Sequence, residues 1–199
     1  MNKITLDDNH IYRLDGAIIP GFSEIAREMG LSDYSHVSQA VMDAACQFGH
    51  AVHSACELHD KGVLDEDSLS LPLVAYLNGW RNFSRDYNVL VVPDWIEAVT
   101  GSARWRFGCK PDRVVVIRDK VVVVEIKSTT SIMPAVSLQT AAQKIAVEEN
   151  YGKVHRRMAV RLTGEDDGCG YCVHEFKNQK DEETFICARK LYAWKKENL

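Results

Sequence analysis

The chain has 199 residues, 46% of them hydrophobic and 26% charged, which is enough for one globular domain with a sizeable core and argues against a disordered chain. Since no apolar run reaches the length of a membrane span and residues 1–8 lack the apolar stretch of a signal peptide, we expect a cytoplasmic protein with reduced cysteines and no membrane partner. The net charge of −4 taken alone argues weakly against a nucleic-acid partner.

The charge is distributed unevenly along the chain. Residues 1–100 contain 6 Lys and Arg against 15 Asp and Glu, whereas residues 101–199 contain 18 against 13. A basic half can mark a surface that faces a polyanion. Solvated helix faces that simply differ in charge would give the same pattern, so charge alone leaves both interpretations open.

The first half of the chain predicts mainly helices. Residues 10–20 are typical of a small hairpin that turns at Asp15-Gly16. Apolar residues then recur with a helical period, and the stripe of the longest helix includes Val41. We expect these helices over residues 22–30, 36–60 and 72–87.

The second half predicts strands around a central hairpin. The β-branched runs 114–117 and 121–124 flank a polar break, which is typical of two buried strands joined by a tight turn. The pattern also predicts extended segments over 89–100 and 103–108, a helix over 135–150, strands over 155–163 and 171–176, and a last helix over 181–197 with Leu191 inward. Together these elements predict one α/β domain over residues 1–199, with a helical part over about 1–88 and a core over about 89–199 that holds a small mixed sheet flanked by helices.

Three charged residues lie at the edges of the central hairpin. Asp112 precedes its first strand, and Glu125 and Lys127 end its second. Since residues two apart in a strand point to the same face, Glu125 and Lys127 project together, and the hairpin can bring Asp112 beside them. Such a group beside an apolar hairpin is costly unless a cation or a reaction uses it. An ordinary exposed ion pair at a strand end is the alternative.

Five motifs in order resemble the PD-(D/E)XK nuclease superfamily, most closely its RecB-type and lambda-exonuclease-like branch. Two of them are the hairpin motifs Pro111-Asp112 and Glu125-Ile126-Lys127. The others are residues 49–53, similar to a "G-x-x-x-H" element, residues 12–20, similar to a "Y-x-x-x-G…P-S-V-T" segment, and residues 138–143, similar to an "L-Q-x-x-x-Y" helix. The resemblance covers residues 12 to 195 and implies a restriction-endonuclease-like core.

The resemblance implies a metal centre. Asp112 and Glu125, with the carbonyl of Ile126, offer hard oxygen ligands that suit Mg²⁺, for which Mn²⁺ would substitute. By the same resemblance His53 joins the metal shell. Lys127 would orient the attacking water and stabilise developing negative charge.

Further residues are expected around this centre. The resemblance implies that Gln139 holds the attacking water or Lys127. Gln143 stands where the family has Tyr, and we expect it to contact DNA by hydrogen bonding alone. Arg104 and Arg106, interleaved with Trp105 ahead of the hairpin, are candidate phosphate contacts. A strand with Trp105 inward and both arginines outward is the alternative.

Two other metal sites are disfavoured by spacing. A zinc site built on His50 and His53 with Glu57 or His59 lacks the HExxH pattern. Some relatives of this branch bind an iron–sulfur cluster, but only one cysteine follows the Cys169-x-x-Cys172 pair, 15 residues later. Cysteines buried in the core are the simpler explanation.

The sequence therefore predicts a Mg²⁺-dependent deoxyribonuclease, an exonuclease of recombination, repair or phage DNA processing. An endonuclease of the same superfamily and a catalytically silent nucleic-acid-binding module remain alternatives. DNA is the expected partner. A homo-oligomer or a recombination-protein partner is compatible with the sequence, which specifies no interface.

Overall fold

The computed structural model describes residues 3–31, 37–164 and 168–199, which form a mixed α/β fold. The predicted α/β class is confirmed. The helices of the described residues are α1 (Phe22–Glu28), α2 (Gln39–Asp60), the 3₁₀ turn η1 (Glu66–Ser68), α3 (Leu71–Asp86), α4 (Ala135–Tyr151) and α5 (Lys180–Asn198). The strands are β1 (Ile4–Leu6), β2 (Tyr12–Leu14), β3 (Ala17–Ile19), β4 (Leu90–Ile96), β5 (Thr100–Ser102), β6 (Phe107–Cys109), β7 (Arg113–Ile117), β8 (Lys120–Lys127), β9 (Arg156–Leu162) and β10 (Tyr171–Glu175).

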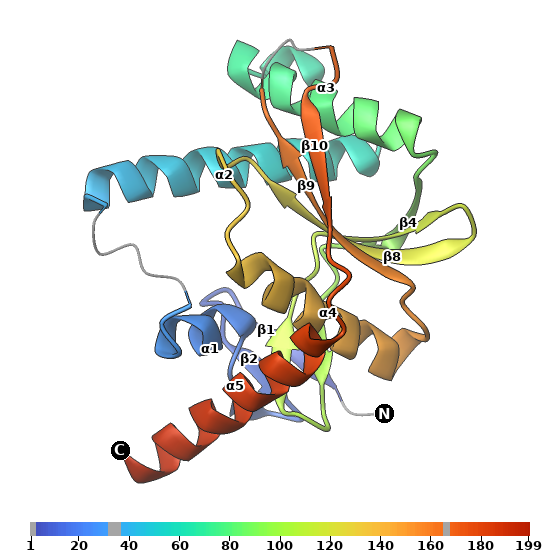
Figure 1. Cartoon of the computed structure of the whole chain (residues 1–199). Coiled ribbons are helices and arrows are strands. Elements are labelled where there is room, and N and C mark those ends of the chain that lie inside the picture. The colour runs from blue at the N-terminus through green and yellow to red at the C-terminus, as the bar shows by residue number, and fades with distance from the viewer. Residues whose placement is uncertain (1–2, 32–36, 165–167) are drawn as a thin grey trace.

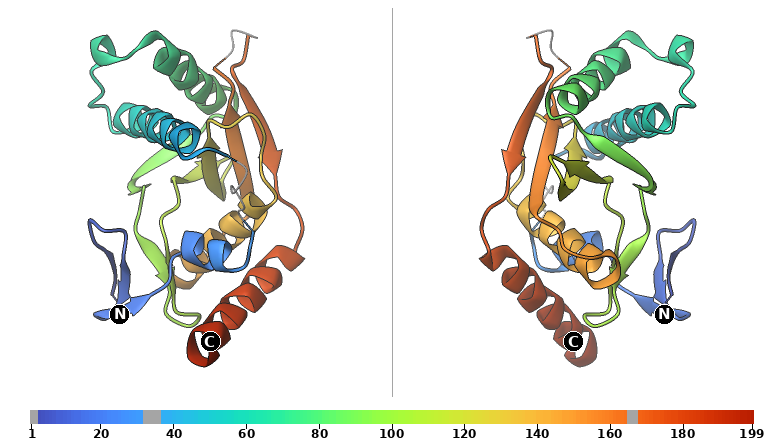
Figure 2. Two further views of the ribbon diagram at one scale, coloured as in Figure 1. Left: turned by 90° about the vertical axis from the view of Figure 1, so that its left-hand side faces the viewer. Right: turned by 90° about the vertical axis from the view of Figure 1, so that its right-hand side faces the viewer.

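The central sheet has the strand order β10-β9-β8-β7-β4, and its strands run between two groups of helices (Figures 1 and 2). Strands β8 and β9 are parallel, and the other neighbours are antiparallel. A parallel pair needs a long crossover connection, which α4 provides. This connection places α4 directly after the charged end of β8.

The predicted hairpin is confirmed as β7 and β8. Val114 pairs with Val123 and Ile117 with Lys120, so the connection contains only Arg118 and Asp119. Both of these residues have positive φ, 49° and 60°, as a two-residue turn that matches the twist of its strands requires. The short turn fixes the register and therefore the face on which each charged residue lies.

The hairpin is buried on both faces. Val115, Val122, Val124 and neighbouring apolar side chains form one core cluster with α2 and α3, which includes Trp80 and Phe83 of α3. On the other face Val114 and Val123 pack with Val147 of α4. A third cluster joins α1, β6, α4 and α5 through residues such as Ile25, Phe107, Ala142 and Phe185. A strand buried on both faces has no need of polar alternation, which explains the unbroken valine runs.

Two predicted segments differ in the structure. Of the strand predicted over 103–108, only 107–108 belong to a strand, and residues 103–106 form the turn between β5 and β6. The carboxylate of Glu149 accepts hydrogen bonds from the backbone N–H of Ala103 (2.9 Å) and Arg104 (3.1 Å), which holds the turn. Likewise the extended segment predicted over 89–100 is interrupted at Glu97, whose φ is 51°.

Two predictions of buried side chains were wrong. Val41, expected on the apolar stripe of α2, is 60% exposed, because the first turns of α2 extend beyond the body of the molecule (Figure 1). Leu191, expected to face inward, is 50% exposed, while Tyr192 is the buried residue of that turn. His36, the predicted start of α2, lies outside the described residues. None of the described helices has the length and apolar character needed to cross a membrane.

Candidate metal and catalytic site

Asp112 is held from two sides at the start of β7. Its Oδ2 accepts a hydrogen bond from the backbone N–H of Ile126 at 2.7 Å, and its Oδ1 lies 3.2 Å from Nδ1 of His53 on α2. The carboxylate is buried, and the imidazole is about a quarter exposed. The structure thus brings together two residues that are 59 positions apart, as the resemblance implies.

Glu97 completes a group that sequence reasoning missed. Ligand atoms of His53, Glu97 and Asp112 all lie within 4.8 Å of one another, so these three residues could hold a metal ion. We refer to these three residues as the His53 group. The backbone N–H of Glu97 donates to the carbonyl of Asp112 at 3.1 Å. The sequence offered one signal for this residue, namely an acidic residue at the end of a predicted extended segment. Antiparallel pairing of that segment with the hairpin places Glu97 beside Asp112.

Glu125 and Lys127 lie on the same face of β8, as their spacing predicts, and both contact side chains of α4. Lys127 Nζ donates to Glu125 Oε1 at 2.8 Å and to Gln139 Oε1 at 3.3 Å. Gln139 Nε2 donates to the same oxygen of Glu125 at 2.6 Å. The predicted association of Gln139 with Lys127 is therefore present. Metal ligation by Glu125 and by the Ile126 carbonyl stays a prediction, since neither belongs to the His53 group.

Gln143 has a different position from the one predicted. Its side chain is 1% exposed, and its Nε2 donates to Glu125 Oε2 at 2.7 Å. The predicted DNA contact through Gln143 is thus corrected, because a side chain buried beneath Glu125 does not reach a strand on the surface. Gln143 and Gln139 instead fix both carboxylate oxygens of Glu125. The residue one helical turn after Gln139 is expected on the same face of α4.

The interaction between His53 and Asp112 shifts the pKa values of both residues. Burial alone would lower the pKa of His53, but the charge and hydrogen bond of Asp112 outweigh burial and raise the pKa to about 9. Burial likewise favours a higher pKa for Asp112, yet His53 and Lys127 lower it below its ordinary value. At neutral pH the two residues therefore form an imidazolium–carboxylate pair. A cation bound here would have to replace the imidazole proton.

The other two carboxyl groups are biased toward the neutral form. Burial, followed by the charge of Asp112, raises the pKa of Glu125 and also that of Glu97. Lys127 opposes the shift at Glu125, and Lys110, 2.8 Å from Glu97, opposes it there. The charge of Asp112 thus repels charge on both Glu125 and Glu97, and a divalent cation would relieve that repulsion.

A buried arginine contacts two residues of the His53 group. Arg113 is fully buried, and its Nε lies 2.7 Å from Oδ2 of Asp60. Asp60 also accepts from the indole N–H of Trp80 at 3.0 Å. Another guanidinium nitrogen, Nη1, donates to the carbonyl of Asp112 and lies 3.5 Å from Glu97. Arg113 therefore contacts the backbone of Asp112 and the carboxylate of Glu97.

A groove of about 620 Å³ lies beside Lys127. Lys127 and Gln139 form one wall, and Arg27 of α1 lies in its lining. The remaining lining residues are Phe22, Ser23, Ala26, Thr129, Met133, Ala135 and Val136. The mixture of apolar side chains, hydroxyls and cations fits a ligand with both an apolar part and an anionic part.

No protein-family model matches the chain, and no curated protein matches it either. Membership of the nuclease superfamily therefore rests on the motifs and on the geometry around Asp112.

The alternative metal ligands are placed elsewhere. Glu57 is paired with Lys61 at 2.5 Å, and His59 lies 3.4 Å from Arg81. Among the described residues, the His53 group includes none of Glu57, His59 and His50. Cys172 is exposed rather than in the core, and its Sγ accepts from Arg161 at 3.4 Å. The core explanation fails for Cys172, whereas Cys56 and Cys109 are buried.

Proposed function

We propose that this protein is a divalent-metal-dependent deoxyribonuclease of the PD-(D/E)XK superfamily, in the RecB-type and lambda-exonuclease-like branch. The observation that carries the proposal is the convergence of His53, Asp112, Glu125, Lys127 and Gln139 on one site. The strand order, with α4 crossing between parallel strands β8 and β9, supports a restriction-endonuclease-like core.

The residues present fit a cation. His53, Glu97 and Asp112 would hold Mg²⁺ or Mn²⁺, with Glu125 adding a ligand if it releases one hydrogen bond. When bound, the ion would act as a Lewis acid on the phosphodiester and lower the pKa of a water molecule. Carboxylate oxygens that are already fixed by Ile126 and by Arg113 would lose little entropy on binding.

We assign the handling of the attacking water to Lys127. Its ammonium faces both Glu125 and the groove, so a water molecule at Nζ would lie beside the phosphate. The positive charge would stabilise negative charge that develops on the phosphate oxygens. Gln139 keeps the ammonium oriented through its 3.3 Å contact.

Lys127→Ala tests this assignment. We expect cleavage of linear DNA in Mg²⁺ to fall by roughly a hundredfold or more, with the thermal unfolding midpoint little changed. Lys120→Ala, an exposed lysine at the other end of β8, is the matched control and should cut as the wild type does. Equal rates for Lys127→Ala and wild type would remove the catalytic assignment.

We infer further that the enzyme is an exonuclease. End-labelled linear DNA should be degraded from its ends, and a closed circle of the same sequence should stay intact. Cutting of the circle would assign an endonuclease instead. Absence of both cleavage and Mn²⁺ binding, measured by calorimetry, would leave the silent binding module as the better account.

A further inference from the structure

A second cationic surface lies outside the metal site, where the β5–β6 turn meets α5. The turn contributes Arg104 and Arg106, and the helix contributes Arg189 and Lys190. The Nε of Arg189 donates to the carbonyl of Arg106 at 3.0 Å, which joins the two segments. We refer to these four residues as the cation patch.

Trp105 organises the patch. The Arg104 guanidinium lies 4.9 Å and the Lys190 ammonium 5.4 Å from the centre of the indole ring. These are cation–π distances, so one partly buried aromatic residue holds two positive charges near each other. The segment is a turn rather than the predicted strand, but the predicted burial is confirmed, since Trp105 packs against the cluster that contains Phe107 while Arg104 and Arg106 are exposed.

The patch lacks negative partners. Within the described ranges, none of its four cations has a carboxylate within ion-pair distance, whereas two other residues of α5 form ion pairs, Glu182 with Lys144 at 2.6 Å and Lys195 with Glu28 at 2.7 Å. The pKa of Arg189 is lowered by burial and by the nearby charge of Arg106, with Tyr192, Glu197 and Glu24 opposing the shift. Like charges gathered without a directly paired carboxylate favour a polyanionic ligand.

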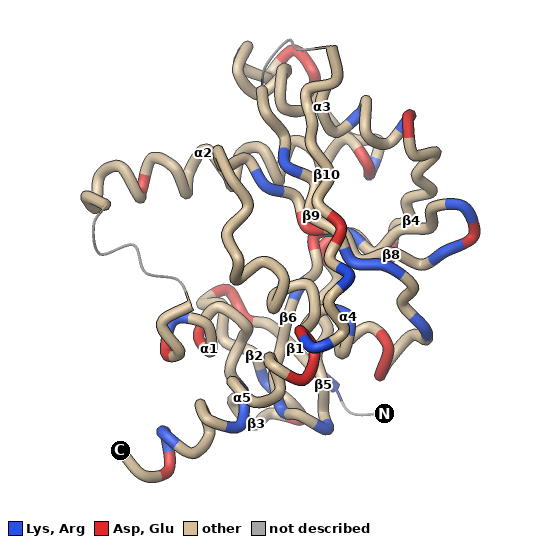
Figure 3. Tube along the Cα trace, in the orientation of Figure 1, with Lys and Arg blue, Asp and Glu red and all other residues tan. Residues whose placement is uncertain are grey.

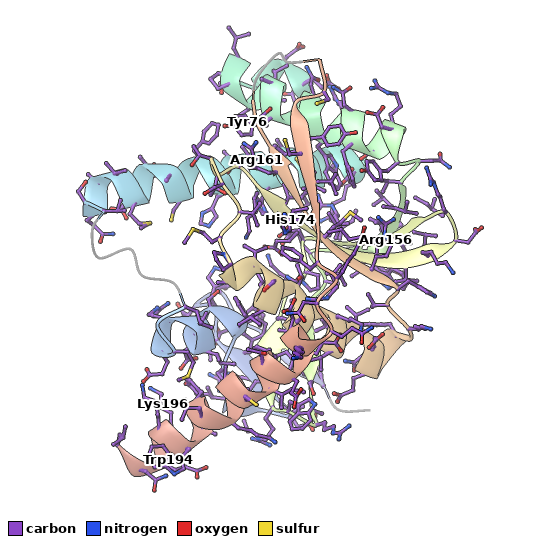
Figure 4. All side chains as sticks on the ribbon, viewed as in Figure 1. Tyr76, Arg156, Arg161, His174, Trp194 and Lys196 are labelled. Carbon is purple, nitrogen blue, oxygen red and sulfur yellow. The ribbon has the colours of Figure 1, made fainter. Side chains whose placement is uncertain are left out.

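The surroundings continue the same chemistry. Trp194 is one helical turn beyond Lys190, and its side chain is 55% exposed. Figure 4 shows Trp194 and Lys196 on the outer part of α5, and Figure 3 shows basic residues along this helix and at the tip of the β5–β6 turn. Exposed aromatic rings beside cations are typical of surfaces that bind nucleic-acid strands.

We propose that the cation patch is a second DNA-binding surface, which holds the phosphate backbone of the substrate away from the metal site. The choice of DNA as the polyanion rests on the proposed function. Contacts of guanidinium and ammonium groups with phosphates carry no sequence information, so the surface adds affinity without sequence preference. Its role is to retain long substrates.

The test compares Arg104→Gln/Arg106→Gln/Lys190→Gln with wild type on two substrates. One is long labelled duplex DNA, with binding measured by anisotropy in Ca²⁺ at several salt concentrations. The other is thymidine 5′-(p-nitrophenyl phosphate), a diester too small to reach the patch, with hydrolysis measured in Mg²⁺. Arg118→Gln/Lys120→Gln/Lys153→Gln removes the same charge from exposed positions on the β7–β8 turn and after α4.

We expect the triple patch variant to bind duplex roughly tenfold more weakly at low salt, and its salt slope to fall by about 0.9 for each phosphate that the protein no longer neutralises. Hydrolysis of the small diester should be unchanged. The control variant should behave as the wild type does on both substrates. Lys190→Glu alone should show the same direction of change and leaves the turn intact.

The outcomes separate the two proposals. If the wild type hydrolyses the diester and the patch variant binds duplex as tightly as the wild type does, the second surface alone would be overturned. A wild type that neither binds duplex nor hydrolyses the diester would overturn both. A patch variant that loses binding to anionic phospholipid vesicles but keeps its DNA affinity would assign the surface to a membrane instead.

Discussion

At the scale of single residues, the site is defined by what each polar atom of Asp112 and Glu125 contacts. All four carboxylate oxygens have a partner from a different part of the chain, namely His53, Ile126, Gln143 and the pair Lys127 and Gln139. Buried carboxylates need such partners, since an unpaired charge in the interior is costly. The partners also fix the orientation of both carboxylates.

Glu97 can be tested as a ligand by Glu97→Gln, which keeps the shape and removes the charge. If Glu97 binds the cation, Mn²⁺ affinity measured by calorimetry should fall by roughly tenfold or more. Glu57→Gln, on the same side of α2 as His53 but outside the group, is the matched control. A loss of stability with unchanged Mn²⁺ affinity would instead make Glu97 a counter-charge for Lys110 and Arg113.

The His53–Asp112 pair predicts a specific dependence of stability on pH. The pKa of His53 is about 9 in the folded protein against an ordinary value of about 6.5. Because the pKa of His53 is higher in the folded protein, protonated His53 contributes its full stabilisation at pH values below its pKa in the unfolded chain. This stabilisation is lost as pH rises toward 9. In EDTA, the difference in unfolding free energy between wild type and His53→Gln should therefore shrink between pH 6.5 and 9. A difference that stays constant over this range would mean that His53 is not charged in the pair.

At the scale of elements, the hairpin was predictable and its surroundings were only partly so. Strands β7 and β8 could be predicted from neighbouring residues alone, because β-branched runs and a two-residue turn are signals within a short stretch of sequence. The position of Glu97 depends instead on antiparallel pairing of β4 with β7, whose register shifts between Val91 and Ile96. The turn at Ala103 depends on Glu149, which is 46 residues away. Contacts between distant segments have no local signature in a single sequence.

The buried pair of Arg113 and Asp60 links β7 to α2 and yields a stability prediction. Arg113→Met leaves Asp60 buried without its cation, so unfolding by denaturant should show a loss of about 3–5 kcal/mol. Adding Asp60→Asn removes the orphaned charge, retains an acceptor for Trp80, and should recover part of the loss. Arg118→Met in the exposed turn should change stability by less than about 0.5 kcal/mol. A loss below about 1 kcal/mol for Arg113→Met would show that the pair is not a structural link.

At the scale of the whole molecule, one side of the hairpin faces α2 and the other faces α4, and each helix brings one part of the site. His53 comes from α2, and Gln139 and Gln143 come from α4 (Figure 1). The groove beside Lys127 and the cation patch on α5 lie on the part of the molecule that contains α1 and α5. Under the proposed function, one DNA strand bound along this part would contact both surfaces.

The most direct test of the central claim is a crystal of the protein soaked with Mn²⁺ and measured for anomalous scattering. We expect a peak within coordination distance, about 2.0–2.3 Å, of Asp112 and of His53 or Glu97. The peak should disappear in Asp112→Asn with the fold unchanged. A crystal in which Mn²⁺ binds only elsewhere, or not at all, while the wild-type protein still cleaves DNA would contradict the assignment of these residues as the metal centre.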